Sequence, residues 1–275
     1  MAEGIGLEDA QKIAVGSPFG APSGPVTTGT LGGVRFTFLS RHGAGHAIPP
    51  SFVNYRANVD VLKRCGVTDL ISLSAIGSLR EEMAPGHMVC ADQFIDRTEG
   101  RVRSFFGPGL VAHLGLADPV CPRLSGLLAG AAEAAGATVH RGGCYVAIEG
   151  PQFSTRAESL MYRQWGADVI GMTAMPELRL AREAELPYAI LGMVTDYDSW
   201  RAEEAGVEAA EVFAVMKANA ERARAALRAF AAALPAARCA SPIDTALDGA
   251  IVTAPAQRDR VLMAKLDAVA GRVLR

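Results

Sequence analysis

The sequence lacks any surplus of positive charge. Its 275 residues include 27 Lys and Arg against 29 Asp and Glu, and the pI is about 6.2. A protein that neutralises a phosphate backbone presents a basic face, so we expect no nucleic acid among its partners. The charge balance favours small molecules as ligands.

Long apolar runs are also missing. The first ten residues contain no basic stretch that leads into an apolar segment, and no later segment is uninterrupted by polar residues for long. A membrane-spanning helix needs about 20 predominantly apolar residues, and a secretory signal has an apolar centre behind a basic start. We therefore expect a soluble, cytoplasmic protein with no membrane partner.

Cysteine is scarce, and its pattern contains no C-x-x-C motif. The five cysteines stand at wide, irregular spacings: Cys65, Cys90, Cys121, Cys144 and Cys239. Zinc sites and disulfide frameworks use regularly spaced pairs. We expect reduced thiols and no metal site.

Hydrophobic residues, by contrast, make up 50% of the chain, which is enough for one large core. We expect residues 1–275 to form a single domain. Residues 1–10 form an atypical, shortened N-terminus in this interpretation, and residues 239–275 form a loop and a final helix.

Strand and helix patterns alternate along most of the chain. Two short extended runs, 26–30 and 34–39, flank two glycines and predict a β-hairpin. Further strands are predicted at 69–75, 87–95, 143–148, 168–172 and 188–195. Helices are predicted at 54–64, 122–135, 155–165, 177–185 and 258–274, the third of them opened by a Thr155–Glu158 capping box. This alternation predicts an α/β fold with a largely parallel sheet and helices on both faces.

Polar residues gather just beyond the predicted strands, where open α/β sheets bind their ligands. In chain order they are Arg41, His42, His46, Ser74 to Ser78, Glu149 to Phe153, Gly171 to Thr173, Thr195, Asp196 and Asp198. A cation, an imidazole, hydroxyls and two carboxylates suit a site that holds an anion at one end and a hydrogen-bonding base at the other. We expect Asp196 and Asp198 to point to opposite sides of their segment, with one of them catalytic and the other a cap of the next helix.

Six ordered motifs identify a family resemblance. They are Arg41 to Gly43 (RHG), Ser74 to Leu79 (SAIGSL), Asp92 to Thr98 (DQFIDRT), Ile148 to Glu158 (IEGPQFSTRAE), Trp165 to Thr173 (WGADVIGMT) and Thr195 to Asp198 (TDYD). Together they resemble the trimeric purine nucleoside phosphorylase family, from about Leu7 to the end of the chain. The resemblance implies a three-layer-like sandwich around a mixed, distorted sheet. It also implies a homotrimer or a dimer of trimers, with inorganic phosphate as co-substrate and no metal or organic cofactor.

The resemblance further implies phosphorolysis of 5'-methylthioadenosine to adenine and 5-methylthioribose 1-phosphate, in purine and methionine salvage. Three alternatives stay open: a phosphorylase of methylthioinosine or other purine nucleosides, a hydrolytic nucleosidase, and a nucleoside-binding protein without turnover. A hydrolase would leave the residues of a phosphate site without an anion. Thermal stabilisation by a ligand without product would indicate the binding protein.

The family's functional residues match positions in this sequence. The implied phosphate site comprises Arg41, His42, Ser74, the Ala75 backbone amide and Thr173, with Ser74 also in a catalytic role. Phe153 and Met172 match the ribose and base walls. Asp196 matches the catalytic carboxylate that faces the purine, supplemented by Asp198. His113 matches a residue that closes a neighbouring subunit's site, and Ala209, Val212 and Phe213 match the pocket for the 5'-substituent.

One motif departs from the family pattern. Members usually have an apolar strand that runs into Gly-Ser-Gly or Gly-Thr-Gly, whose hydroxyl and amides bind phosphate. Here the corresponding residues are Gly4-Ile5-Gly6, and the hydroxyl is missing. This departure predicts weaker binding of phosphate.

Overall fold

The predicted hairpin forms in the computed structural model, which describes residues 5–201 and 209–274 apart from the side chains of 209–214 and 216–218. Its strands are β2 (Val26–Leu31) and β3 (Val34–Phe38). The backbone φ angles of Gly32 and Gly33 are 57° and 79°, as a two-residue hairpin turn requires. A further strand, β1 (Glu8–Ile13), pairs with β2. It was not predicted, because its mostly exposed polar residues show no alternation.

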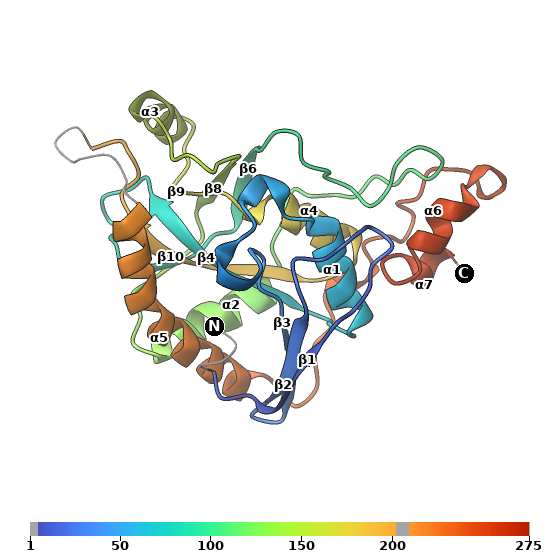
Figure 1. Ribbon diagram of the computed structural model, residues 1–275, viewed down its shortest axis with the longest axis horizontal. Helices are drawn as coiled ribbons and strands as arrows, with labels where there is room; N and C mark the ends of the chain where they lie inside the picture. Colours follow the sequence, from blue (N-terminus) through green and yellow to red (C-terminus); the bar gives the residue numbers. More distant parts are fainter. Residues whose placement is uncertain (1–4, 202–208, 275) are drawn as a thin grey trace.

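A second, larger sheet forms the centre of the protein (Figure 1). Its strands are β4 (Leu70–Ser78), β5 (Met88–Cys90), β6 (Gln93–Arg97), β7 (Val139–Arg141), β8 (Cys144–Ile148), β9 (Val169–Gly171) and β10 (Tyr188–Asp196). They lie in the order β6-β8-β9-β4-β10-β5-β7. The pairs β9–β4 and β10–β5 are antiparallel, and the other four pairs are parallel. The predicted mixed, largely parallel sheet is confirmed.

The single strand predicted over residues 87–95 is wrong. The chain leaves β5, which lies between β10 and β7, and enters β6 at the opposite edge of the sheet. Asp92 fixes this crossing, because its carboxylate accepts a hydrogen bond from the Gly143 amide at 3.0 Å. The amides of Asp92 and Gln93 both donate to the Gly143 carbonyl. The strand β7 also went unpredicted.

Helices cover both sides of this sheet. They are α1 (Tyr55–Arg64), α2 (Pro122–Ala134), α3 (Arg156–Gln164), α4 (Ala174–Glu183), α5 (Ala209–Ala233), α6 (Arg260–Lys265) and α7 (Gly271–Leu274), with short 3-10 helices at Ala44–His46, Pro50–Phe52, Pro242–Thr245 and Pro255–Gln257. In Figure 1, α2 and α5 lie on one side of β10, while α1 and α4 pack together on the other. The capping box predicted at the start of α3 is present. None of the helices in the described part combines the length and apolar character needed to cross a bilayer.

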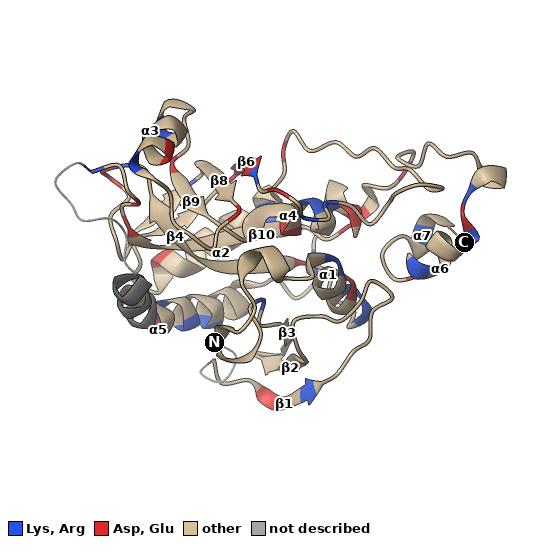
Figure 2. Ribbon diagram, turned by 45° about the horizontal axis from the view of Figure 1, so that its top comes forward, with Lys and Arg blue, Asp and Glu red and all other residues tan. Residues whose placement is uncertain are grey.

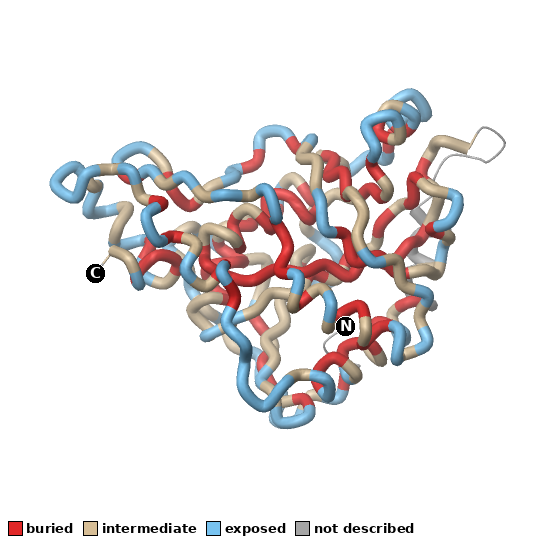
Figure 3. The backbone as a smooth tube through the Cα atoms, turned by 180° about the vertical axis from the view of Figure 1, so that it is seen from behind, coloured by how far each residue is buried: buried red, intermediate tan, exposed pale blue. Residues whose placement is uncertain are grey.

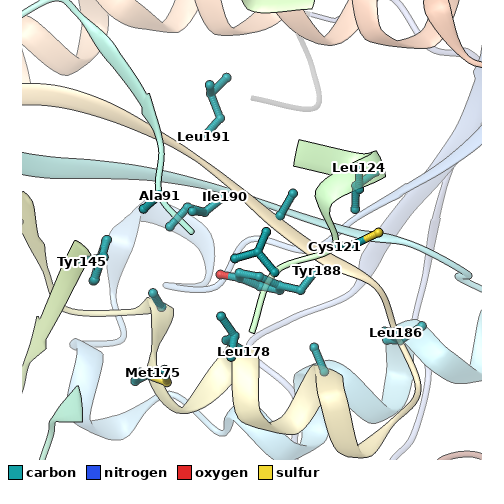
Figure 4. Packing of buried hydrophobic residues seen from close by; sticks show 14 of the residues in the cluster. Ala91, Cys121, Leu124, Tyr145, Met175, Leu178, Leu186, Tyr188, Ile190 and Leu191 are labelled. Atoms are coloured by element: carbon teal, nitrogen blue, oxygen red, sulfur yellow. The ribbon is translucent and has the colours of Figure 1, made fainter. Parts of the chain in front are cut away.

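The main core surrounds β10, which appears as a continuous buried path in Figure 3. All residues of this strand except the last are buried. Figure 4 shows Leu178 of α4 facing Tyr188 of β10, with Leu191 on the other side of the strand. Burial on both faces explains why this strand reads as an unbroken apolar run instead of an alternating one.

The single helix predicted over residues 258–274 is interrupted. The Asp259 carboxylate accepts from the Leu262 amide and opens α6, which ends at Lys265. The chain then turns inward, so that Leu266, Val269 and Ala270 are at most 2% exposed. Burial of these three side chains overrides the helical periodicity.

Glu183, at the end of α4, ties the long loop between β6 and α2 to the core. Its carboxylate accepts hydrogen bonds from the Ser104 hydroxyl at 2.7 Å and from the Phe105 amide at 2.6 Å. Burial raises the pKa of this carboxyl group from 4.5 to about 7, because desolvation outweighs the hydrogen bonds. The folded state therefore holds a proton here that the unfolded state has already lost at neutral pH.

A raised carboxyl pKa makes the free energy of unfolding fall as the pH rises from about 4.5 to about 7. We compare the free energy of unfolding of Glu183→Gln with that of the wild type. The difference should favour the variant by about 2–3 kcal/mol more at pH 8 than at pH 5. Denaturant unfolding of both proteins at the two pH values measures this difference. The exposed Glu133→Gln serves as the control, and an equal effect of Glu183→Gln at both pH values would contradict the prediction.

Candidate active site

A cavity of about 1400 Å³ extends along β4, and Gly171 and Asp196 line it at the carboxyl ends of β9 and β10. It brings together most of the residues singled out in the sequence: Arg41, His42, Ser74, Ala75, Phe153, Met172, Thr173, Asp196 and Asp198. It exceeds the roughly 300–1,000 Å³ of ordinary small-molecule sites. The extra space runs between β3 and β4 toward α5, where Phe36, Leu73 and Leu227 line it.

Two buried hydroxyls meet at one end of this cavity. Ser74 Oγ and Thr173 Oγ1 are 3.4 Å apart, and the two residues are 8% and 4% exposed. Ser74 lies within β4, which runs three residues further than predicted, to Ser78. Thr173 is the N-cap residue of α4.

The Ala75 amide reaches this end of the cavity because β4 has an open edge. The Leu70 amide donates to the Pro187 carbonyl, which precedes β10. Backbone groups of a strand alternate in direction, so the Ala75 amide points away from β10. On that side β9 pairs only with the last two residues of β4 in the described part of the chain. The Ala75 amide, which was predicted to donate to phosphate, is therefore not paired with a neighbouring strand among the described residues.

Arg41 is held by a bidentate ion pair. Its Nε and Nη2 donate to the two carboxylate oxygens of Glu177 at 2.7 and 2.9 Å, and Nη2 also donates to the Ser72 hydroxyl at 2.7 Å. The Tyr188 hydroxyl donates to the same carboxylate. Burial alone would lower the pKa of Arg41, but the charge and hydrogen bonds of Glu177 outweigh it and raise that pKa. The guanidinium is therefore charged and fixed in orientation.

His42 lies beside Arg41 in a defined tautomer. Its Nδ1 is 2.8 Å from the Ile48 carbonyl, so Nδ1 carries the proton and Nε2 is an acceptor in the neutral ring. The ring stacks on His46 with centroids 4.1 Å apart. Burial lowers the pKa of His42, and the neighbouring positive groups act in the same direction.

Asp196 is the last residue of β10 and pairs with Gly77, three residues along β4 from Ser74. Its carboxylate accepts from the Thr195 hydroxyl at 2.6 Å and from the Asp198 amide at 2.9 Å. Burial nevertheless raises its pKa. Gly77 of β4 makes room for it, since a Cβ there would lie 2.8 Å from Asp196 Oδ1.

The expectation that Asp196 and Asp198 point to opposite sides is wrong. Residues two apart in an extended segment share a face, and both side chains line the cavity. Burial raises the pKa of Asp198, while the hydroxyls of Ser159 and Ser154 oppose the rise. The carboxyl groups of Asp196 and Asp198 therefore both face the cavity.

Phe153 and Met172 form apolar walls of the cavity. Phe153 is 39% exposed in the described structure, which is high for a phenylalanine. Met172 packs so closely on Gly150 that a side chain at Gly150 would overlap its sulfur atom. Gly150 also has a φ of 65°, so this position suits only glycine.

Some residues matched through the resemblance are not among the described residues that line this cavity. His113 is exposed on the loop between β6 and α2, where its amide donates to the Ala250 carbonyl. The side chains of Ala209, Val212 and Phe213 lie outside the described residues, although their backbone belongs to α5. Ile5 is 1% exposed and packs with Leu31, Leu227 and Ala231 away from the hydroxyls.

Sequence reasoning missed Glu177 and its partner Tyr188. Glu177 was assigned only to the start of a helix, yet it is 9% exposed and oriented toward Arg41. An acidic residue among the apolar residues of a predicted helix was the available signal, because buried carboxylates need partners. Arg41, the cation that Glu177 holds, lies 136 residues away in the sequence.

Charges elsewhere on the protein are mixed in sign. Figure 2 shows basic and acidic residues interspersed over the helices and loops. Among residues 5–201 and 209–274, no three His, Cys, Asp or Glu side chains are grouped as metal ligands would be. Around Ser74 and Asp196 the cavity offers hydroxyls, the guanidinium of Arg41, the imidazole of His42 and the carboxyl groups of Asp196 and Asp198.

Comparison with known proteins agrees with this arrangement. The phosphorylase superfamily profile matches residues 4–232. S-methyl-5'-thioadenosine phosphorylases of Cereibacter sphaeroides and Bradyrhizobium diazoefficiens are 57% and 54% identical over 272 residues, 98% of this chain and 94% of each relative. A solved methylthioadenosine phosphorylase from an antarctic soil metagenomic library has a TM-score of 0.91 at 43% identity, with 96% of this chain and 93% of that chain covered. The Schistosoma mansoni methylthioadenosine phosphorylase in complex with adenine has a TM-score of 0.86 at 36% identity, with 90% and 96% covered. The chain therefore belongs to the phosphorylase superfamily.

Proposed function

We propose that this protein catalyses the phosphorolysis of 5'-methylthioadenosine to adenine and 5-methylthioribose 1-phosphate. The observation that carries the proposal is one cavity lined by the buried hydroxyls of Ser74 and Thr173, the fixed guanidinium of Arg41 and the half-buried Asp196 carboxyl. The names of the similar proteins support the substrate. Purine and methionine salvage is the corresponding metabolic role.

In this proposal, inorganic phosphate binds between Ser74, Thr173 and Arg41. The hydrogen bonds of Arg41 to Glu177 and Ser72 engage Nε and Nη2, and Nη1 donates to a phosphate oxygen. The Ala75 amide and His42 complete the anion site. A phosphate oxygen then attacks C1' of the sugar while the phosphate charge stabilises the developing ribosyl cation.

The adenine leaves as a neutral base in the same step. Asp196 accepts a hydrogen bond from the 6-amino group and delivers a proton toward N7, so the electrons of the breaking C1'–N9 bond are taken up without a free anion. Its raised pKa favours the protonated form needed for that role. Asp198 supplements it, and Phe153 and Met172 hold the sugar and the base.

We further infer a homotrimer or dimer of trimers in which His113 closes a neighbouring site. His113 is exposed, and so are the apolar Phe52 and Val102, at 80% and 55%. Exposed apolar side chains of this size are typical of subunit contacts. The 5'-pocket roles of Ala209, Val212 and Phe213 stay predictions. The five free cysteines suit the reducing cytoplasm, where we place the enzyme.

The test is adenine release from 5'-methylthioadenosine by the purified protein, with and without phosphate, beside methylthioinosine and adenosine. We expect release only with phosphate, and the highest kcat/KM for 5'-methylthioadenosine. Release without phosphate would instead indicate a hydrolase. Thermal stabilisation by these nucleosides without any product would indicate a binding protein.

A further inference from the structure

Tyr145 is a buried tyrosine to which the mechanism above gives no role. It lies on β8, is 0% exposed, and its ring contacts that of Phe94 with centroids 5.5 Å apart. In Figure 4 it stands beyond Met175, at the side of the core where α4 begins. A phenylalanine would satisfy this packing, so the hydroxyl needs its own explanation.

The hydroxyl of Tyr145 reaches the anion end of the cavity. A Cβ on Gly171 would overlap the Tyr145 oxygen, so this oxygen lies directly against the backbone that leads into Thr173. The Ser74 hydroxyl and the amides of Thr173 and Ala174 are the groups that interact with it. They oppose the effect of burial, which raises the pKa of Tyr145 to about 12.

In the described structure this hydroxyl has no partner with full hydrogen-bond geometry. Such groups are rare among buried side chains, and they often mark a site that is completed by a ligand. Ser74 is equally poorly bonded, at 3.2 Å from its neighbour's carbonyl and 3.4 Å from Thr173 Oγ1. Two weakly bonded hydroxyls therefore adjoin the place where phosphate is expected.

We propose that Tyr145 is a positioning residue that orients the Ser74 hydroxyl toward phosphate, an inference that rests on the proposed function. The amides of Thr173 and Ala174 donate toward the tyrosine oxygen, which then gives its single proton to Ser74 Oγ. A serine oxygen that already accepts this proton directs its own proton to the anion. The proton of Ser74 thus points to phosphate instead of to the Ala75 carbonyl.

A double-mutant cycle tests this order of donation. Tyr145→Phe is expected to raise the KM for phosphate about fivefold to tenfold, because one hydrogen bond to a charged group is weakened. The KM for 5'-methylthioadenosine should stay within about twofold. In a Ser74→Ala background, Tyr145→Phe should add less than about a twofold change, since the group it orients is gone. Tyr162→Phe, a buried tyrosine on α3, is the matched control.

Binding of inorganic phosphate alone, measured by calorimetry, gives a second readout that does not depend on turnover. Tyr145→Phe should raise the phosphate Kd about as much as it raises the KM, and it should change the Kd little in the Ser74→Ala background. An effect of Tyr145→Phe that is the same with and without Ser74 would overturn the proposal, as would a lowered Tm with unchanged phosphate affinity. If the effects of Tyr145→Phe and Ser74→Ala on the phosphate Kd are coupled but no nucleoside is turned over, the proposed function is refuted and the role of Tyr145 stands.

Discussion

Replacing Asp196 with Asn is expected to lower kcat/KM for 5'-methylthioadenosine by about a hundredfold to ten-thousandfold, the usual contribution of a general acid. The amide oxygen can still accept from the Asp198 amide, and the Thr195 hydroxyl can accept from the amide nitrogen while it donates to the Ile76 carbonyl, so the local fold should persist. It cannot deliver a proton to the purine. Because the amide donates a hydrogen bond where the carboxylate accepts one, activity on methylthioinosine should rise by at least about tenfold relative to 5'-methylthioadenosine.

Steady-state kinetics with both nucleosides at saturating phosphate measure this change. Asp118→Asn, on the loop before α2, is the control and should leave both activities unaltered. Thermal denaturation separates a chemical effect from unfolding, since the Asp196→Asn protein should keep a Tm close to that of the wild type. Retention of most of the activity on 5'-methylthioadenosine would exclude Asp196 as the proton donor.

Arg41→Met should have the second large effect, on both phosphate binding and stability. The KM for phosphate should rise at least about a hundredfold, because the fixed guanidinium of the anion site is lost. The free energy of unfolding should fall by about 3–5 kcal/mol, since Glu177 is then buried without its partner. The two side chains are only 13% and 11% exposed, so solvent screens the pair little.

The double variant Arg41→Met/Glu177→Gln separates the two effects. Removing both charges should restore most of the stability while phosphate binding stays lost. Denaturant unfolding and phosphate titration are measured on the wild type, Arg41→Met and the double variant. The exposed Arg141–Glu133 pair is the matched control, and Arg141→Met should change stability little. Recovery of phosphate affinity in the double variant would contradict the role given to Arg41.

Elements with a local signal were predictable from the sequence. The two glycines of the hairpin, the Thr155 capping box and the apolar run of β10 each specify structure within a few residues. The break between β5 and β6 was not predictable, because it depends on bonds between Asp92 and the distant Gly143. The interrupted final helix likewise reflects burial against the rest of the protein, which periodicity does not encode.

The same distinction holds at the candidate site. Motifs located the residues that line the cavity, most of which follow or end a strand, while Ser74 and Ala75 lie within β4. They did not reveal which side chains hold these residues in place. Glu177 fixes Arg41 across 136 residues, and Tyr145 meets Ser74 only after β8, β9 and β4 assemble. Supporting contacts of this kind arise from the fold and leave little local pattern.

The open edge of β4 has a consequence for the timescale of amide exchange. Alternate amides along one strand face different surroundings, so protection against deuterium should alternate as well. The amides of Leu70, Ser72 and Ser74 point toward β10 and should exchange slowly, while that of Ala75 points into the cavity and should exchange fast. Bound phosphate would then appear as the slowing of a single amide within a strand whose other rates are unchanged.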